Sequence, residues 1–374
     1  MILLIGADLV PTKSNIDIFV HGDITNLMGE KLLTLWNSAD IRIFNLEVPL
    51  CDNEDPIEKC GRNLIAPTNT SVGIKALKPS LVTLANNHIL DQGVQGLKST
   101  IEVLSQNGIP FVGAGYNLDE ASKPYIIEKN NIKIGIYACA EHEFSIASED
   151  TPGANPFDPL ESLDHIKNLK EECDYVIVLY HGGKEYYRYP SPYLQKICRK
   201  IAQKGADVVI CQHSHCIGCY EEFEGSNIIY GQGNFIFDHS ESDFSKTSLL
   251  VRIDINKELK LNYIPIMKNG NSIRLAEDFE AKEILEDFER RSSEIVESGF
   301  IEKKYNEFAL NNFLSYIRKL AGMGKALSRF DRIFLNNLLV RHKYNKKKLL
   351  AIQNYIECEA HRELMLTGLK KGFK

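Results

Sequence analysis

The sequence predicts an α/β protein with a helical extension at its C-terminal end. Up to about residue 270, short runs of β-branched and aromatic residues alternate with segments of helical spacing, the pattern of a parallel or mixed sheet covered by helices. From about residue 276 the character changes to Glu- and Lys-rich helical segments. We therefore expect an α/β domain over residues 1–272 and a basic helical extension over residues 273–374.

The first fifty residues contain two predicted strands that end in acidic side chains. One apolar run ends in Asp8 and a second ends in Glu47. Between them we predict a strand over residues 16–20 and a helix over about residues 28–38. Asp23 follows the strand predicted at 16–20 and competes with Asp8 for the role of an acidic ligand, but we rank it lower.

A third apolar run begins at Leu81 and leads into an amide, an imidazole and a carboxylate, those of Asn87, His88 and Asp91. Residues 51–70 are predicted as a loop over the site and residues 140–160 as a second long loop, because both are rich in Pro and polar side chains. Further strands are predicted at 111–112, 125–127, 133–137, 249–255 and 259–266, the last two as an edge hairpin, and helices at 97–108, 160–173 and 191–205.

Three of the ten histidines follow strand-forming runs in the middle of the chain. His181 follows the run 176–180, and His213 and His215 follow the run 208–210. In an α/β sheet, ligands bind in the crevice beyond the carboxyl ends of the strands. Residues two apart in an extended segment point to the same side, so we expect His213 and His215 to face a common centre. Imidazole, carboxylate and amide oxygen together suit a divalent transition metal, or a pair of them.

These strand-end residues belong to a series of short motifs that runs from about residue 3 to residue 238. The series includes Asn45-Leu-Glu47, Leu84-Ala-Asn-Asn-His88, His181-Gly, Glu185-Tyr186, Gly205-Ala-Asp207, His213-Ser-His215 and Gly233-Asn-Phe235. It resembles the bacterial CapA family of capsule and poly-γ-glutamate synthesis proteins, which belongs to the calcineurin-like metallophosphoesterase superfamily. The resemblance implies a four-layer α/β/β/α sandwich with a metal centre at the strand ends.

The resemblance also implies the ligands of one or two divalent metal ions, Mn, Fe or Zn. One ion would be held by Asp8 and His215, the other by Asn87, His181 and His213, and Glu47 would take the bridging carboxylate position. The sequence departs from the superfamily pattern at two positions. Val10 stands where the superfamily has a histidine, which leaves the first site poorer in ligands, and the bridging residue is usually Asp rather than Glu.

Residues around such a centre are predicted to take part in catalysis. Two metal ions about 3.5 to 4 Å apart activate a bound water and clamp the attacking and leaving oxygens of a displacement at phosphorus. His88 is then placed to protonate the leaving oxygen, with Asp91 orienting it, although His88 could equally be a hydrogen-bond donor to the substrate. We predict that Arg62, Glu185 and His142 contact the substrate, with a surface arginine as the alternative for Arg62.

The nine cysteines are irregularly spaced and odd in number, which favours reduced thiols in a cytoplasmic setting over a disulfide framework. Cys216 and Cys219 form a CxxC directly after the histidine pair. This motif could be a second metal or redox element, or two buried thiols in a turn.

Charge is unevenly distributed along the chain. Residues 301–374 hold 16 Lys and Arg and 6 Asp and Glu, a net charge of +10, whereas residues 1–300 hold 28 and 44, a net charge of −16. The basic segment predicts an association with an anionic membrane surface, an acidic polymer or a synthase complex, or else it is a solvated or self-packed helical tail. We expect no nucleic acid as a partner.

No stretch approaches the roughly 20 apolar residues of a membrane span, and the N-terminal apolar run lacks the basic flank of a signal peptide. We therefore expect a cytoplasmic protein, peripheral at most at the inner face of the membrane. The predicted function is a metal-dependent hydrolase of phosphoester type in capsule, surface polysaccharide or poly-γ-glutamate production. Two alternatives stay open: a non-hydrolytic assembly factor that uses the same pocket, and a metal-dependent amidohydrolase. The substrate would be an anionic or phosphorylated small molecule or polymer.

Overall fold

The structure, a computed structural model, describes residues 1–238, 242–256 and 258–372. It divides into two compact units, Met1–Ile301 and Glu302–Lys374. The boundary predicted after residue 272 is therefore wrong, since it falls inside strand β16 (Ser272–Leu275) of the first unit. Helix α9 (Asp278–Ile295), whose exposed faces carry the Glu and Lys residues that suggested a new domain, also belongs to the first unit.

The larger of the two main sheets of the first unit has eight strands. Its order is β16-β15-β14-β1-β2-β3-β4, and β13 also pairs with β1. Strands β1 to β4 and β13 are parallel, whereas β14 to β16 join antiparallel. The predicted hairpin is present as β14 and β15, but β16 rather than the hairpin forms the edge. The remaining bounds are β1 (Ile2–Val10), β2 (Ile41–Leu46), β3 (Leu81–Thr83), β4 (Phe111–Val112), β13 (Asn234–Phe237), β14 (Thr247–Ile255) and β15 (Leu259–Asn269).

The second sheet has six strands in the order β11-β12-β10-β9-β7-β6, of which β12, β10, β9 and β7 are parallel. Their bounds are β6 (Tyr125–Lys129), β7 (Ile132–Ala140), β9 (Tyr175–His181), β10 (Val208–Gln212), β11 (Tyr220–Phe223) and β12 (Ser226–Tyr230). A small separate ladder joins β5 (Ala114–Gly115) to β8 (Gly153–Ala154). The strands predicted at 111–112, 125–127 and 133–137 are thus confirmed.

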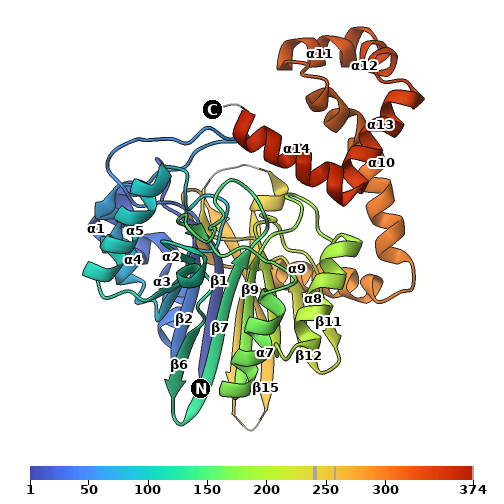
Figure 1. Ribbon diagram of the computed structural model, residues 1–374. Helices are drawn as coiled ribbons and strands as arrows, with labels where there is room; N and C mark the ends of the chain where they lie inside the picture. The colour runs from blue at the N-terminus through green and yellow to red at the C-terminus, as the bar shows by residue number, and fades with distance from the viewer. Residues whose placement is uncertain (239–241, 257, 373–374) are drawn as a thin grey trace. The chain divides into compact units, whose positions relative to one another are not determined.

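The two sheets pack face to face, and helices cover their outer faces (Figure 1). Alternate residues of β9 show this layering. Ile177 and Leu179 lie in the core shared with the first sheet, whereas Val176 and Val178 lie in a second core formed with helices α7 (Ser162–Glu172) and α8 (Pro192–Gln203). Successive side chains of a strand point to opposite faces, so a strand buried on both sides feeds two cores. The predicted four-layer α/β/β/α sandwich is confirmed.

Five helices accompany the first sheet on its outer side (Figure 1). Trp36 of α3 is fully buried there, with its ring centroid 4.9 Å from that of Phe235 and 6.4 Å from that of Phe44. The indole N–H donates to the carbonyl of Leu77, so the polar atom of this large side chain is satisfied. The helices are α1 (Ile16–His21), α2 (Ile24–Met28), α3 (Glu30–Asn37), α4 (Ser71–Ala76) and α5 (Gly93–Gln106), with a shorter α6 (Leu118–Ala121) farther along the chain.

The strand predicted at residues 16–20 is wrong, because this segment is helix α1. Asn15 accepts a hydrogen bond from the backbone N–H of Thr12 and turns the chain into the helix, and Gly22 ends it with a φ of 67°. Within the helix only Phe19 is fully buried. A five-residue apolar run is too short for periodicity to separate a helix from a strand.

Helix α9 packs on both sheets, against β11 at the edge of one and against β15, next to the edge, in the other. Phe288 is fully buried, and its ring centroid lies 5.2 Å from that of Tyr220 on β11 and 4.8 Å from that of Tyr263 on β15. This contact is the physical reason that the helix belongs to the sandwich and not to the following unit.

Helices joined by short turns make up the second unit, and no strand occurs within residues 302–372. Its helices are α10 (Phe300–Leu320, which starts in the first unit), α11 (Lys325–Phe334), α12 (Leu338–Lys343), α13 (Lys346–Glu357) and α14 (Glu359–Gly372). Within the ranges that the structure covers, none of the chain's helices combines the length with the apolar character that crossing a membrane requires.

Candidate metal centre

The carboxyl ends of the parallel strands of both sheets meet at one edge of the sandwich, and the six predicted metal ligands lie there. All six side chains are buried, between 0% and 8% exposed. Their elements are β1 for Asp8, the segments after β2 and β3 for Glu47 and Asn87, the last residue of β9 for His181, and the segment after β10 for His213 and His215.

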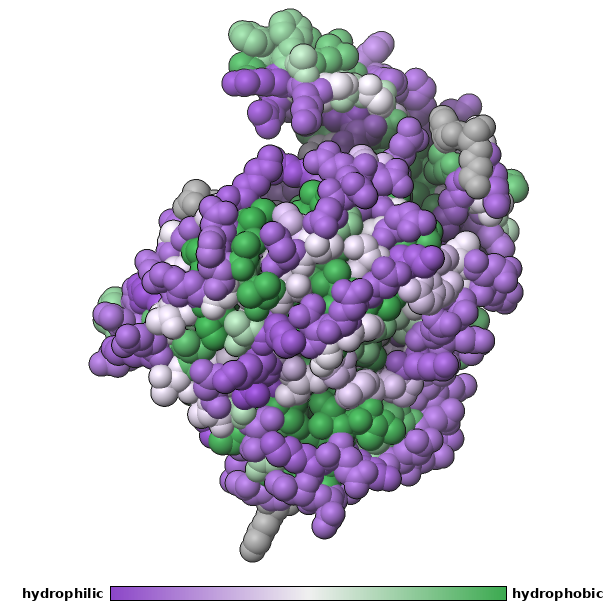
Figure 2. Space-filling view, turned by 90° about the vertical axis from the view of Figure 1, so that its left-hand side faces the viewer, coloured by the Kyte–Doolittle hydropathy of each residue, from purple (hydrophilic) through white to green (hydrophobic). Residues whose placement is uncertain are grey.

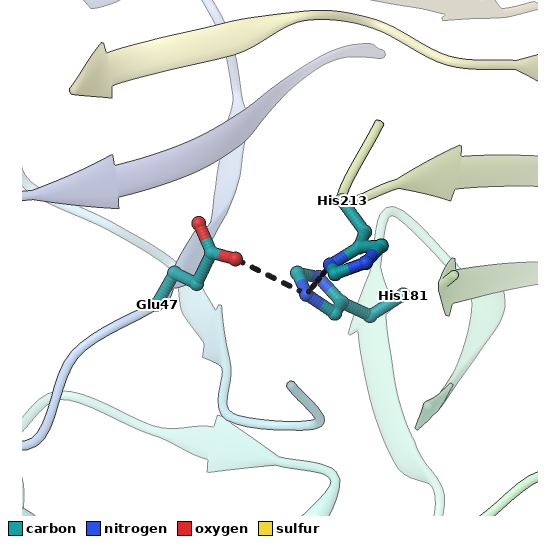
Figure 3. A group of neighbouring side chains, drawn as sticks. All are labelled: Glu47, His181 and His213. Atoms are coloured by element: carbon teal, nitrogen blue, oxygen red, sulfur yellow. Dashed lines mark hydrogen bonds and ion pairs between the residues drawn. The ribbon is translucent and has the colours of Figure 1, made fainter. Parts of the chain in front are cut away.

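Glu47, His181 and His213 form one potential ligand group (Figure 3), and the side chain of Asn87 lies beside it. His181 Nε2 lies 3.0 Å from Asn87 Oδ1, 3.1 Å from His213 Nδ1 and 3.2 Å from Glu47 Oε1. Neighbouring ligand atoms at right angles, each about 2.1 Å from one cation, are about 3.0 Å apart. The spacing of these four side chains therefore suits a shared divalent ion.

Asp8, Glu47 and His215 form a second group, whose ligand atoms also lie within 4.8 Å of one another. His215 Nδ1 lies 3.6 Å from Asp8 Oδ2 and 2.8 Å from Asn234 Oδ1. Glu47 is the one residue that both groups share. The division of the residues between two groups matches the two ligand sets that the family resemblance implies.

Glu47 carries the strongest sign that a cation belongs here. Its side chain is fully buried, and neither carboxylate oxygen receives a hydrogen bond of acceptable geometry from the residues described, although Oε1 lies within ion-pair distance of His181. Burial, together with the nearby charge of Asp8, raises the pKa of Glu47 to about 8. An unpaired buried carboxylate is costly, and a bound cation would remove that cost.

The imidazoles of the first group favour their neutral form, which is the form that binds metals. Burial lowers the pKa of His181 to about 4 and that of His213 well below its ordinary value. At His215 burial acts in the same direction, but the charges of Glu47 and Asp8 outweigh it and raise the pKa. A cation would replace the proton that these two carboxylates otherwise favour on His215.

An irregularity of strand β1 orients the side chain of Asp8. The register of β1 shifts on both sides of Asp8, against β2 and against β13, and such bulges redirect side chains near active sites. Asn45 of β2 then holds the carboxylate, because its amide donates to Asp8 Oδ1 at 2.8 Å and also lies 3.2 Å from His181 Nδ1. Asn45 thus orients one residue from each ligand group.

The backbone at His213 and His215 differs from the extended segment that we predicted. Strand β10 ends at Gln212, and both histidines have positive φ, 80° and 53°, so the segment is not extended. A left-handed backbone at non-glycine residues is strained and needs support from surrounding contacts. One such contact is the backbone N–H of His213, which donates to Asp8 Oδ2 at 3.2 Å. The two rings consequently face neighbouring ligand groups, not one common centre.

The predicted catalytic pair His88 and Asp91 is in contact. His88 Nδ1 lies 2.5 Å from Asp91 Oδ2, and Asp91 is fully buried. His88 directly follows the predicted ligand Asn87, so the pair lies next to the ligand groups.

Sequence reasoning missed Lys59, which lies on the loop predicted to cover the site. Its ammonium group, with a side chain only 3% exposed, pairs with Asp91 Oδ1 and lies 3.2 Å from His88 Nδ1. The backbone N–H of Leu64, on the same loop, donates to Asp91 Oδ2 at 2.6 Å. Asp91 therefore fastens the loop to the turn that carries His88. The only available signal was the mixture of charges in residues 51–70, which does not identify a partner.

Of the three predicted substrate residues, two are exposed and one is half-buried. Arg62 is exposed on the covering loop. Burial raises the pKa of Tyr186, and the positive charge of Arg62 opposes this rise. Glu185 is half-buried, and its charge contributes to the raised pKa of both Glu47 and His215. His142 is exposed on the loop after β7. The charge of its neighbour Glu143 opposes the lowering of the pKa of His181 by burial.

Asp23 and the CxxC motif stay outside the centre. Asp23 accepts a hydrogen bond from the backbone N–H of Asn26 and caps helix α2, which explains its position after a glycine. Cys216 and Cys219 are free, fully buried thiols, and burial raises the pKa of Cys216 to about 11. Neither belongs to a group of three potential metal ligands among the residues described. The geometry favours two buried thiols in a turn.

Val10 is 2% exposed and lies in the hydrophobic core. The group of Asp8, Glu47 and His215 therefore has no ligand from that position. The two groups differ in their imidazoles, since one contains His181 and His213 and the other only His215.

The model of the family described as bacterial capsule synthesis protein PGA_cap matches residues 2–239. A PGA biosynthesis protein CapA of Bacillus subtilis is 30% identical over 60% of this chain and 60% of its own, and a capsule biosynthesis protein CapA of Bacillus anthracis is 28% identical over 59% and 56%. The chain thus spans less than two thirds of the length of these relatives.

A solved structure of a putative 5'-nucleotidase from Staphylococcus aureus in complex with alpha-ketoglutarate is 14% identical, with a TM-score of 0.46 over 77% of this chain and 58% of that chain. A hypothetical protein from Thermus thermophilus is 13% identical, with a TM-score of 0.45 over 70% and 98%. The family match covers the strands that carry all six predicted ligands and more than half of the sequence. The chain belongs to the bacterial capsule synthesis protein family PGA_cap.

Proposed function

We propose that this protein is a metal-dependent hydrolase that cleaves a phosphoester, or a related anionic ester, in the production of capsule or poly-γ-glutamate. One observation carries the proposal: the buried carboxylate of Glu47, which receives no hydrogen bond from the described residues, belongs to both groups of potential ligands. Two ions bridged by a carboxylate suit in-line displacement at phosphorus. The names of the Bacillus relatives support the biological setting.

Divalent ions held by the two groups would lower the pKa of a bound water and polarise the ester oxygens. The chain's own residues supply the positioning and a proton. Asp91 holds Nδ1 of His88, so Nε2 is the ring nitrogen left to give a proton to the leaving oxygen. Lys59 pairs with the charge of Asp91 and holds the loop that bears Arg62, the cation available to an anionic substrate.

Metal content and hydrolysis, measured on the same preparations, test the proposal. We expect the purified full chain to hold more than one equivalent of Mn, Fe or Zn, and to hydrolyse bis-p-nitrophenyl phosphate or p-nitrophenyl phosphate only with metal. His213→Ala should lose metal and activity together, whereas His21→Ala, at an exposed position on α1, should keep both. A metal-free chain, or hydrolysis that EDTA leaves unchanged, would contradict the proposal.

The same assay separates the alternatives. Stoichiometric metal with cleavage of γ-glutamyl-p-nitroanilide, and none of the phosphoesters, would replace the phosphoesterase with an amidohydrolase. Absence of both metal and hydrolysis would favour a non-hydrolytic assembly factor.

A further inference from the structure

Exposed hydrophobic side chains are concentrated in the helical unit. Among the residues described, 26 large hydrophobic side chains are exposed, and 17 of them lie between Leu310 and Leu369. Figure 2 shows such side chains, in green, gathered on the helices at the top of the view. A stable monomeric protein rarely exposes so many apolar groups together, and such patches usually mark an interaction site.

Helix α11 shows the pattern most sharply. Its apolar stripe is open to solvent, with Leu327 48%, Phe330 49% and Phe334 72% exposed. At 100° per residue, Lys325, Arg329 and Arg332 project from the opposite side of the helix.

A buried carboxylate holds the side of α11 that faces α12. Asp331 is fully buried and accepts hydrogen bonds from the backbone N–H groups of Leu339 and Val340 at the start of α12. The helix therefore buries its acid and exposes its aromatic residues, the reverse of a helix that packs on a protein core. Leu338 and Leu339, 64% and 42% exposed, extend the apolar surface onto α12.

The segment that carries this apolar surface is also strongly basic. Residues 325–350 contain eight Lys and Arg and one acid, the buried Asp331. Lys346, Lys347 and Lys348 form an uninterrupted cluster at the start of α13, where all three are exposed. Apolar side chains next to lysine and arginine, on helices that do not span a bilayer, are the pattern of a helix that lies in the membrane interface.

We propose that residues 325–350 bind the surface of a bilayer that contains anionic lipids, with the exposed Leu, Phe and Ile side chains among the headgroups and the basic side chains on the lipid phosphates. Charge complementarity favours this occupant over a second copy of the chain, because two copies would bring together two segments that each carry a net charge of +7. The proposal does not depend on the metal centre.

Vesicle flotation of the full chain tests it, with vesicles of phosphatidylcholine alone or mixed with phosphatidylglycerol. We expect binding to the anionic vesicles that weakens with salt. Each basic residue near an anionic surface contributes about a fivefold factor in affinity, so K346Q/K347Q/K348Q should weaken binding on the order of 100-fold. F330S/F334S, which removes two exposed aromatic anchors, should weaken it on the order of 30-fold.

Matched controls lie in the first unit. K167Q/K196Q/K282Q removes three exposed lysines and Leu160→Ser removes an 80% exposed leucine, and both should bind as the wild type does. His213→Ala should also keep vesicle binding, which separates this proposal from the metal-dependent activity.

Vesicle binding that survives both helical-unit variants, or that ignores lipid charge, would overturn the proposal. So would a chain that binds no vesicles and self-associates in sedimentation velocity through Phe330 and Phe334, since the apolar surface would then be an interface between copies. Because all substituted side chains are exposed, unchanged helicity by circular dichroism is expected and rules out unfolding as the cause.

Discussion

Replacing Glu47 by Gln should change the stability of the metal-free protein in a pH-dependent way. The folded protein raises the pKa of Glu47 from 4.5 to about 8, chiefly by burial. The folded state therefore retains a proton that the unfolded chain releases, and the stability from this group is present below pH 4.5 and is lost as the pH rises towards about 8. Gln does not titrate, so the stability of E47Q does not fall with pH for this reason.

The magnitude follows from the difference between the two pKa values. One pKa unit corresponds to about 1.4 kcal/mol, so ionisable Glu47 should cost about 1 kcal/mol at about pH 5 and roughly 4 kcal/mol at about pH 8. The free energy of unfolding of E47Q relative to the wild type should therefore rise by roughly 3 kcal/mol over this range. His181 and His213 titrate in both proteins, so the comparison largely removes their contribution.

Urea denaturation in EDTA measures this difference, with the fluorescence of Trp36 as the signal. Trp36 is the chain's single tryptophan and is buried in the first unit, so it reports on the sandwich alone. The exposed Glu149→Gln is the matched control, because its carboxylate is in water in both states. With saturating Mn²⁺ the order should reverse, and the wild type should be the more stable protein.

A difference between E47Q and the wild type that stays constant across this pH range would refute the reasoning. It would mean that Glu47 is ionised and paired in the metal-free protein. If E47Q gains as much stability from Mn²⁺ as the wild type does, Glu47 does not bridge the two ligand groups.

Three further predictions concern the centre and its support. Metal titration followed by calorimetry should give two unequal steps, because the group around His181 has two imidazoles and the other group has one, and Asn87→Ala should weaken the tighter step; two equal steps would contradict this. Lys59→Met should lower kcat on the order of tenfold with little change in metal content, and Lys59→Arg should restore part of it, since Lys59 positions Asp91; an unchanged kcat would exclude that role. Phe288→Ala should destabilise the first unit by about 3 to 5 kcal/mol in urea, because it empties the contact of α9 with both sheets; a loss below about 1 kcal/mol would contradict it.

Much of the sandwich could be predicted from local patterns. Strand runs such as 176–180 and 208–210 are apolar on both faces, and the polar residues that follow them mark the edge where ligands bind. Periodicity failed where the segment was short, at residues 16–20, or where the buried stripe was narrow, in α9. In α9 the six Glu and Lys residues outnumber the four buried positions, so composition alone suggested a separate helical domain.

The sequence by itself determined the chemical inventory: which acids, amides and imidazoles follow strand-forming runs, and that a basic segment follows an acidic one. Only the tertiary structure decided how they are grouped, because ligand groups form from β1, β2, β3, β9 and β10 across two sheets. It also brought Lys59 to Asp91 from a loop without periodicity, and turned the apolar stripe of α11 outwards. These outcomes depend on contacts between residues far apart in sequence, and such contacts leave no mark in the local pattern of either partner.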